Sequence, residues 1–262
     1  MCSSDLASGY REVVISGVNL GQYGRDLSER DANGLKKTPR TSFVRLLRKV
    51  LDGTGIEKLR LSSVEPLDFT DKLLDLIAST PRIARHIHAP LQSGSDRILR
   101  RMHRKYTAAR YRERILAAHA RFPNAAFGAD VIVGFPGETD TDFQQTYALI
   151  DELPMNYLHV FPYSRRTGTP ADQMHDQVPP PVIRERARTL RDLSARKNQQ
   201  FRERQVGLQL SAITLDEEVN EGRLALTDNY LRVQLPQLFA SGTHVTIQVH
   251  GATQTSLIGQ IR

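Results

Sequence analysis

The sequence predicts an α/β protein, a partial (β/α) barrel followed by a small all-β barrel. Between residues 13 and 161, short β-branched runs alternate with segments of helical periodicity, a pattern typical of a parallel sheet with helical crossovers. Each run ends in Gly, Ser, Asn, Gln or Glu, as strands do at the C-terminal rim of a barrel. From residue 206 the runs become short and turn-bounded, which favours a small β-barrel. A doubly wound sheet is the alternative for the first part.

The composition is that of a globular protein with a basic surface. The 262 residues suggest one large domain, or one large and one small domain. We find neither an apolar run of about 18 residues nor a signal peptide, so we expect a cytoplasmic protein outside membranes. The net charge of +7 suits a polyanion such as RNA, although a basic enzyme has the same balance. Nothing in the sequence indicates the oligomeric state.

The single cysteine, Cys2, excludes a disulfide framework and a multi-cysteine metal site within this sequence. It lies in residues 1–6, MCSSDL, which have no periodicity and resemble the translation of a sequencing adapter. We interpret these six residues as an artefactual leader. Residues 7–10 follow abruptly and are typical of the last turn of a helix. The sequence therefore predicts a chain that is truncated at its N-terminus.

Residues 126–140, AFGADVIVGFPGETD, form the centre of the sequence. The β-branched run 131–133 predicts a buried strand, and residues 134–137, Gly-Phe-Pro-Gly, predict a tight turn with close backbone approach. Thr139 is expected to cap the next helix, with Asp140 and Asp142 at the positive end of its dipole. Such a junction tolerates anions. A tight turn without a ligand is the alternative.

The same patterns place the other elements. Strands are expected at residues 13–15, 59–61, 86–89 and 157–161, and helices after Thr41 or Ser42, Thr70 and Thr107. Residues 25–40 are expected to be a loop with a turn at Asn33-Gly34. We expect four regions: the leader (1–6), the partial barrel (7–178), a linking basic helix (179–205) and an RNA-binding β-barrel (206–262).

Three motifs point to a family: HAPLQSGSD (88–96), ADVIVGFPGET (129–139) and YLHVFPYSRRTGTPA (157–171). With GVNLGQYG (17–24), RLSSVEP (60–66) and LTDNYLRV (226–233), they resemble the radical S-adenosylmethionine methylthiotransferases, in the same order and over nearly the whole chain. GVNLGQYG together with LTDNY resembles most the branch that acts on threonylcarbamoyladenosine in tRNA.

The resemblance implies a partial radical S-adenosylmethionine barrel without its first strand, followed by a TRAM domain that holds tRNA. In this family a [4Fe–4S] cluster cleaves S-adenosylmethionine, and a methylthio group is installed at C2 of an adenosine next to the anticodon. One cluster is held by a C-x-x-x-C-x-x-C loop and a second by three cysteines of an N-terminal domain. This sequence contains neither set, so we expect the fragment to be inactive, with no catalytic residue and no metal ligand. An RNA-binding fragment and a methylthiotransferase acting on a ribosomal protein are the alternatives.

The resemblance also implies which residues contact S-adenosylmethionine. The expected cofactor-binding residues are Gly17, Asn19, Ser62, Glu65, Gln92, Ser93, Arg104, Asp130, Gly134, Val160 and Phe161. Glycine permits close backbone approach, and amide or carboxylate groups bond hydroxyl and ammonium groups. For each polar residue the alternative is that it only closes a loop.

Two histidines and a basic stretch are assigned no firm role. His86 and His88 lie two apart, hence on opposite faces of a strand, which makes them poor joint metal ligands; we interpret them as packing residues. Residues 97–114 carry eight Arg or Lys side chains, as a solvated helix face often does. We expect one or two of them, with Arg104 as the first candidate, to reach the cofactor carboxylate or the tRNA backbone.

Overall fold

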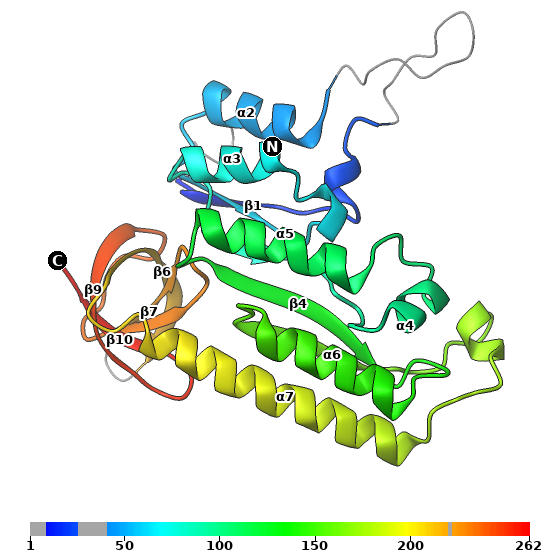
Figure 1. Ribbon diagram of the computed structural model, residues 1–262. Helices are drawn as coiled ribbons and strands as arrows, with labels where there is room; N and C mark the ends of the chain where they lie inside the picture. The colour runs from blue at the N-terminus through cyan, green and yellow to red at the C-terminus, as the bar shows by residue number, and fades with distance from the viewer. Residues whose placement is uncertain (1–8, 26–40, 220–221) are drawn as a thin grey trace, which may run out of the picture. The chain divides into compact units, whose positions relative to one another are not determined.

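Figure 1 shows the computed structural model, in which residues 9–25, 41–219 and 222–262 are described. The expected leader with Cys2 and most of the expected 25–40 loop, including its Asn33-Gly34 turn, lie outside these residues. The chain divides into two compact units, residues 1–87 with 202–262 and residues 88–201, and each is described by itself. The four regions expected from the sequence stay a prediction. None of the helices in the described ranges is both long enough and apolar enough to cross a membrane.

The first unit contains a parallel strand pair. β1 (Glu12–Ile15) pairs with β2 (Lys58–Leu61) in the register Val13 to Leu59, and Leu59 also forms a parallel bridge with Ile83. The predicted caps are confirmed: the side chains of Ser42 and Thr70 accept backbone N–H groups at the starts of α2 (Phe43–Gly53) and α3 (Asp71–Ser79). Two short 3₁₀ turns, η1 (Leu20–Gln22) and η2 (Pro66–Asp68), follow the two strands.

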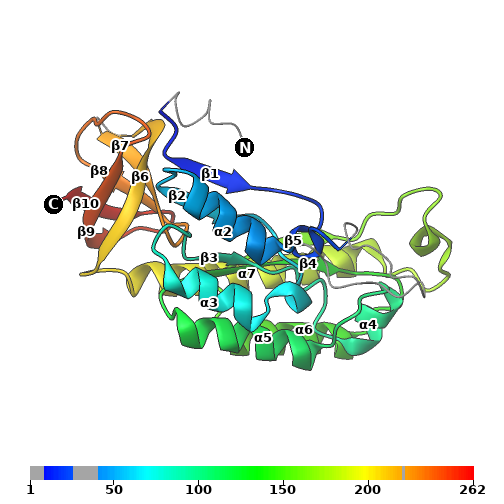
Figure 2. The same ribbon diagram turned by 90° about the horizontal axis from the view of Figure 1, so that it is seen from above.

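The second unit carries β4 (Ala126–Val133) and β5 (Tyr157–Pro162), which form a three-stranded sheet in the order β3-β4-β5 with β3 (His86–His88), the strand at which the second unit begins. β4 and β5 are parallel. The helices between them are α4 (Asp96–Arg101), α5 (Ala108–Arg121) and α6 (Asp140–Glu152), and η3 (Pro170–Gln173) follows β5. Figure 2 shows α5 and α6 on the same side of β4 and β5. The alternation of parallel strands and helices predicted from the sequence is confirmed.

β4 begins five residues earlier than the predicted strand at 131–133. Its first half contains Gly128 and two alanines, Ala126 and Ala129, residue types that are depleted in strands. Gly128 is required by packing, because a Cβ there would lie 2.0 Å from Cζ of Tyr157 on β5. The Tyr157 ring thus occupies the space above Gly128. A glycine that weakens the local strand signal here makes room for a neighbouring side chain.

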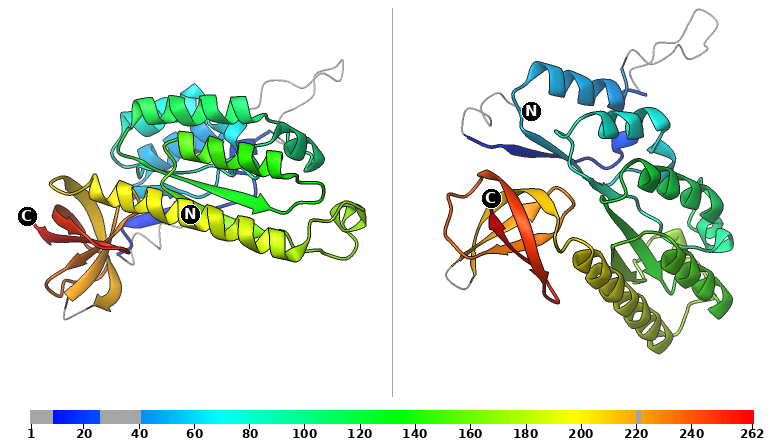
Figure 3. Two further views of the ribbon diagram at one scale, coloured as in Figure 1. Left: turned by 60° about the horizontal axis from the view of Figure 1, so that its bottom comes forward. Right: turned by 60° about the vertical axis from the view of Figure 1, so that its left-hand side comes forward.

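α7 (Pro180–Glu203) borders the second unit over most of its length. A basic helix was predicted in residues 179–205, and the apolar residues Ala187, Leu190 and Leu193 of α7 are buried. Ser194 Oγ accepts the backbone N–H of Leu158 at 2.8 Å, and the side-chain amide of Asn198 donates to the Asn156 carbonyl. Figure 3 shows α7 extending alongside α6 and the sheet. Side chains of α7 therefore hold the start of β5 in place by hydrogen bonds to its backbone.

The C-terminal segment forms a closed five-stranded barrel in the order β10-β8-β7-β6-β9, visible in the right panel of Figure 3. All five strands lie within the region predicted to form this barrel, residues 206–262: β6 (Gln209–Val219), β7 (Gly222–Thr227), β8 (Arg232–Leu235), β9 (His244–Ala252) and β10 (Leu257–Ile261). Ala225, Val233, Ile247 and Leu257 fill the interior and are at most 1% exposed. The predicted small β-barrel is confirmed.

The turn between β7 and β8 packs on β2 within the first unit. Arg60, on β2, is buried; its Nε donates to Glu12 at 2.7 Å, and its other nitrogens donate to the carbonyls of Thr227 and Asp228. The Arg60 guanidinium also lies over the ring of Tyr230, 5.4 Å from its centre, and that ring stacks on His86 at 4.2 Å. Tyr230 has φ +65°. One arginine therefore satisfies backbone carbonyls of the turn and a carboxylate of β1.

We predict that Arg60→Ala lowers the free energy of unfolding of the first unit by about 3 kcal/mol, because it leaves the Glu12 carboxylate and two carbonyls without their buried donor. The measurement is urea denaturation followed by circular dichroism. The matched control is Arg232→Ala, which removes the exposed ion pair with Glu217 and should cost less than about 1 kcal/mol. Equal losses in the two variants would contradict this assignment.

Candidate cofactor site

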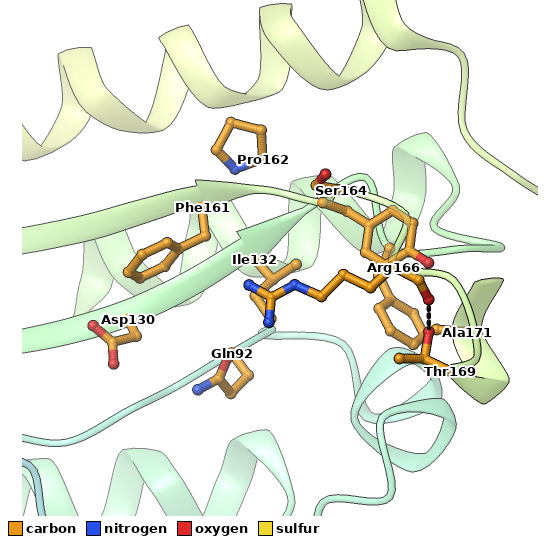
Figure 4. Close-up of a pocket in the computed structure, with 11 residues that line it drawn as sticks. Gln92, Asp130, Ile132, Phe161, Pro162, Ser164, Arg166, Thr169 and Ala171 are labelled. Carbon is orange, nitrogen blue, oxygen red and sulfur yellow. Dashed lines mark hydrogen bonds between the residues drawn. The ribbon is translucent and has the colours of Figure 1, made fainter.

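A cavity of about 460 Å³ lies in the second unit, along the C-terminal halves of β4 and β5 and the segment that follows β5. Figure 4 shows its lining. The lining residues are Gln92, Asp130, Ile132, Phe135, Phe161, Pro162, Tyr163, Ser164, Arg166, Thr169 and Ala171. Cavities of this size with apolar walls and a few converging polar groups are typical small-molecule sites.

Gln92 is held at the cavity by its backbone. Its N–H donates to the Asp130 carbonyl at 2.8 Å, and its own carbonyl accepts the N–H of Ile132 at 2.9 Å. These bonds hold Gln92 at φ +62°, a conformation that is costly for a residue with a side chain. The segment after β3 thereby continues along β4, and the Gln92 amide lines the cavity.

The residues after Gln92 are clamped by α6. Gly94 N–H donates to Thr146 Oγ1 at 2.9 Å, and a Cβ on Gly94 would lie 2.5 Å from the Thr146 Cα. Ser93 Oγ lies 3.3 Å from the same hydroxyl, and Ser95 Oγ donates to Asp142 at 2.6 Å. Ser93 is 0% exposed. The structure therefore places the Ser93 side chain against α6, where it closes the turn that presents Gln92.

Asp142 organises the start of α6. Its carboxylate accepts from Ser95, from the guanidinium of Arg97 and from both the N–H and the hydroxyl of Thr139, and the Thr139 hydroxyl accepts the Asp142 N–H in return. This reciprocal pair is a capping box. Burial by itself raises the pKa of Asp142, but the hydrogen bonds from Arg97, Ser95 and Thr139 together hold it well below its usual range.

Asp130 lies between two histidines. Its Oδ1 is 3.2 Å from Nε2 of His88 on β3 and 3.2 Å from Nδ1 of His159 on β5. Burial raises the pKa of Asp130, but the hydrogen bond and charge of His88, followed by those of His159, outweigh it, so that the pKa lies below its ordinary value. Asp130 is therefore an ionised carboxylate at the edge of the cavity. The interpretation of His88 as a packing residue missed this polar cluster.

Gly134 has a structural reason to be glycine. It has φ +75°, and a Cβ there would lie 2.3 Å from Cγ1 of Ile183 on α7. Its N–H donates to the Glu138 carboxylate at 2.8 Å, which Arg186 of α7 also contacts. This turn fits closely against α7, and Gly134 is not among the residues that line the cavity.

The expected cofactor-binding residues thus separate into groups. Gln92, Asp130 and Phe161 line the cavity, whereas Ser93, Arg104, Gly134 and Val160 belong to the same unit but do not line it. Gly17, Asn19, Ser62 and Glu65 lie in the first unit, where Asn19 precedes η1 and Glu65 precedes η2. Their roles stay predictions. Arg166 and Thr169 were quoted within a motif but not assigned, although they line the cavity.

Most of the basic stretch is paired within the protein. Arg97 contacts Asp142 and the Gly137 carbonyl, and Arg101 contacts Asp176. On α5, Arg110 pairs with Glu113 and Arg112 pairs with Glu152. The run of positive charge in the sequence is therefore largely neutralised by nearby carboxylates, as on a solvated helix face.

We predict that Asp142→Asn lowers the free energy of unfolding at pH 7 by roughly 2 kcal/mol, because charge-assisted bonds to a buried carboxylate are lost. The folded pKa is depressed, so this stabilisation is present above the ordinary aspartate pKa near 4 and disappears as the pH falls through the lower folded value. The two proteins should converge in acid. Urea denaturation at several pH values tests this, with exposed Asp151→Asn as control; a gap that persists in strong acid would contradict it.

Comparison with known proteins identifies the fold family. Residues 8–150 match the radical SAM superfamily. Threonylcarbamoyladenosine tRNA methylthiotransferase MtaB of Aquifex aeolicus (strain VF5) is 38% identical over 226 residues, which are 86% of this chain and 51% of that protein. The tRNA-2-methylthio-N(6)-dimethylallyladenosine synthase of Thermobifida fusca (strain YX) is 38% identical over 213 residues, 81% of this chain and 41% of that protein.

Among solved structures, the radical SAM enzyme coproporphyrinogen III oxidase (HemN) from Escherichia coli superposes with a TM-score of 0.49 at 16% identity, over 82% of this chain and 54% of that chain. The chain spans about half the length of the curated relatives it matches. The superfamily match covers more than half of the 262 residues and confirms the resemblance found in the motifs. The chain therefore belongs to the radical SAM superfamily.

Proposed function

We propose that the chain is the cofactor-binding and RNA-binding part of a tRNA methylthiotransferase that modifies threonylcarbamoyladenosine next to the anticodon. The carrying observation is the set of six motifs in family order, of which GVNLGQYG and LTDNY favour this branch. Similar relatives are named for threonylcarbamoyladenosine and for dimethylallyladenosine, so the choice of branch rests on those two motifs. A tRNA substrate implies a cytoplasmic location.

The cavity suits S-adenosylmethionine, which when bound supplies the methyl group and the radical of this chemistry. The ionised Asp130 accepts hydrogen bonds from hydroxyl groups such as those of a ribose, and the Gln92 amide both donates and accepts. Phe161, which is exposed and lines the same cavity, offers a flat apolar surface to an adenine ring. Arg166 supplies a fixed positive charge for a carboxylate. These residues bind and orient the cofactor in our proposal.

The residues present do not fit an iron–sulfur cluster. A [4Fe–4S] cluster needs several thiolates, and the sequence has one cysteine. We therefore derive no step through a cluster for this chain. The same count favours a second candidate function, an RNA-binding fragment without chemistry of its own.

An RNA-binding role is supported by α7 and the closed barrel. Arg184, Arg188 and Arg191 are exposed and recur at the helical spacing i, i+4 and i+7, so they share one face of α7. Such a row of guanidinium groups matches successive phosphates of a nucleic acid. The net charge of +7 and a small closed β-barrel point the same way.

We predict that the chain binds S-adenosylmethionine and that Asp130→Ala weakens this binding at least about tenfold, because a charged hydrogen-bond partner is worth 1.5–3 kcal/mol. Isothermal titration calorimetry with the purified chain measures the affinity. Asp192→Ala, which removes an exposed carboxylate on α7, should leave it unchanged. Wild-type affinity in the Asp130 variant would place the cofactor elsewhere.

We predict that the chain binds tRNA with an affinity that falls steeply with salt, because counterions are released from the phosphates. Replacing Arg184, Arg188 and Arg191 together by Ala should reduce the slope of log K against log salt by up to about three. Filter binding from low to high salt gives both values. Replacing Arg110, Arg112 and Arg121 of α5 makes the control of equal charge. Equal effects of the two triple variants would show that only net charge matters.

The choice of branch is tested in cells. The segment of the Aquifex aeolicus relative that precedes the matched region is fused in front of this chain and expressed in a bacterium lacking methylthiotransferases. We expect 2-methylthio-threonylcarbamoyladenosine in hydrolysed tRNA, measured by mass spectrometry. The 2-methylthio derivative of dimethylallyladenosine would instead assign the other branch, and methylthiolation of a ribosomal protein would remove tRNA as the substrate.

A further inference from the structure

His88, Asp130 and His159 bring three ligating atoms to one place, all within 4.8 Å of one another. They come from the neighbouring strands β3, β4 and β5, and Asp130 and His159 are direct register partners. No two of the three are close in sequence. From the sequence we predicted no metal ligand, because His88 was considered only as a joint ligand with His86.

The distances match metal coordination. Two ligands at about 2.0–2.1 Å from a tetrahedral ion lie about 3.3 Å apart, and the Asp130 oxygen is 3.2 Å from each histidine nitrogen. The two histidine nitrogens lie within 4.8 Å of each other, so an ion bound by all three groups draws the two rings together by up to about 1.5 Å. Two imidazoles and one carboxylate form a donor set that zinc, cobalt and ferrous ions share.

The surroundings hold the ligands in position. The Tyr157 ring stacks against His88, with centres 6.0 Å apart, and lies 5.3 Å from His159. The backbone next to His88 is held as well, because the buried hydroxyl of Tyr111 donates to the carbonyl of Ala89 at 2.9 Å. The Asp130 carbonyl accepts the N–H groups of Leu91 and Gln92. Ligands fixed by packing and by outer hydrogen bonds lose little freedom when an ion binds.

The site is closed on one side and open on the other. The His88 side chain is 8% exposed, that of Asp130 is 22% exposed, and that of His159 is 54% exposed. Three protein ligands with one accessible side leave coordination positions for water or another small ligand, as in catalytic rather than structural sites.

We propose that His88, Asp130 and His159 form a binding site for one divalent first-row transition ion of the zinc or cobalt type. The proposal goes beyond the proposed function: it shares the Asp130 carboxylate with the proposed cofactor site, but it rests on His88 and His159, which do not line that cavity. The competing description is a carboxylate that accepts hydrogen bonds from two imidazoles and binds no ion.

The test uses the untagged chain after treatment with a chelator, titrated with Co²⁺ alone. We expect one equivalent to bind with visible absorption bands of a low-coordinate ion, and Zn²⁺ to abolish them. His159→Ala and Asp130→Asn should each weaken binding by more than the ten- to hundred-fold that loss of an outer hydrogen-bond partner costs. His250→Ala, which removes an exposed histidine of β9, should bind as the unaltered chain does.

Circular dichroism of each variant verifies folding, and a rise in melting temperature with Zn²⁺ gives a second readout that only the intact site should show. Absence of the cobalt bands in the unaltered chain overturns the proposal. Undiminished binding in His159→Ala and Asp130→Asn also overturns it, as does loss of binding in His250→Ala. Because His159 does not line the cavity, His159→Ala should lose the cobalt bands and still bind S-adenosylmethionine, which distinguishes failure of the metal proposal from failure of the proposed function.

Discussion

The buried ion pair between Glu138 and Arg186 is the contact on which the cavity end of the sheet depends. The Glu138 carboxylate accepts from the Gly134 N–H at 2.8 Å and from Arg186 at 2.7 Å, and Arg186 also donates to the Glu138 carbonyl and to Asp140. Burial raises the pKa of Glu138, and the Gly134 N–H and Arg186 oppose this. A buried carboxylate is tolerated only with such partners, so the turn after β4 and α7 hold each other in place.

This mutual dependence explains why the turn has so little freedom. Gly134 leaves space for Ile183 of α7, the Gly137 N–H donates to the Asp176 carbonyl at 2.7 Å, and the Arg186 guanidinium covers the Phe143 ring. Phe135, between these anchors, lines the cavity. The turn at residues 134–137, which in the sequence resembles an anion-binding turn, therefore packs against α7. It affects a ligand in the cavity only indirectly, by holding Phe135 in the cavity wall.

Local signals in the sequence were sufficient for much of the fold. Ser42, Thr70, Thr107 and Thr139 all cap helices as expected, because a cap depends on residues three positions apart. The candidate site was harder to predict from the sequence. Gln92, Asp130 and Phe161, which the resemblance assigned to cofactor binding, line the cavity, and that role stays a prediction. The approach of His159 to Asp130 depends on the register of β4 with β5, which no local pattern records.

The register of β4 with β5 also restricts which substitutions can be accepted during evolution, as Gly128 and Tyr157 illustrate. No side chain fits at position 128 while the ring is present, since its first carbon would lie 2.0 Å from that ring. Loss of the ring first would leave His88 and His159 without the surface against which both pack. A substitution at either position alone therefore gives a protein with a steric clash or a lost packing surface. We expect Gly128 and Tyr157 to be retained together or replaced together during evolution.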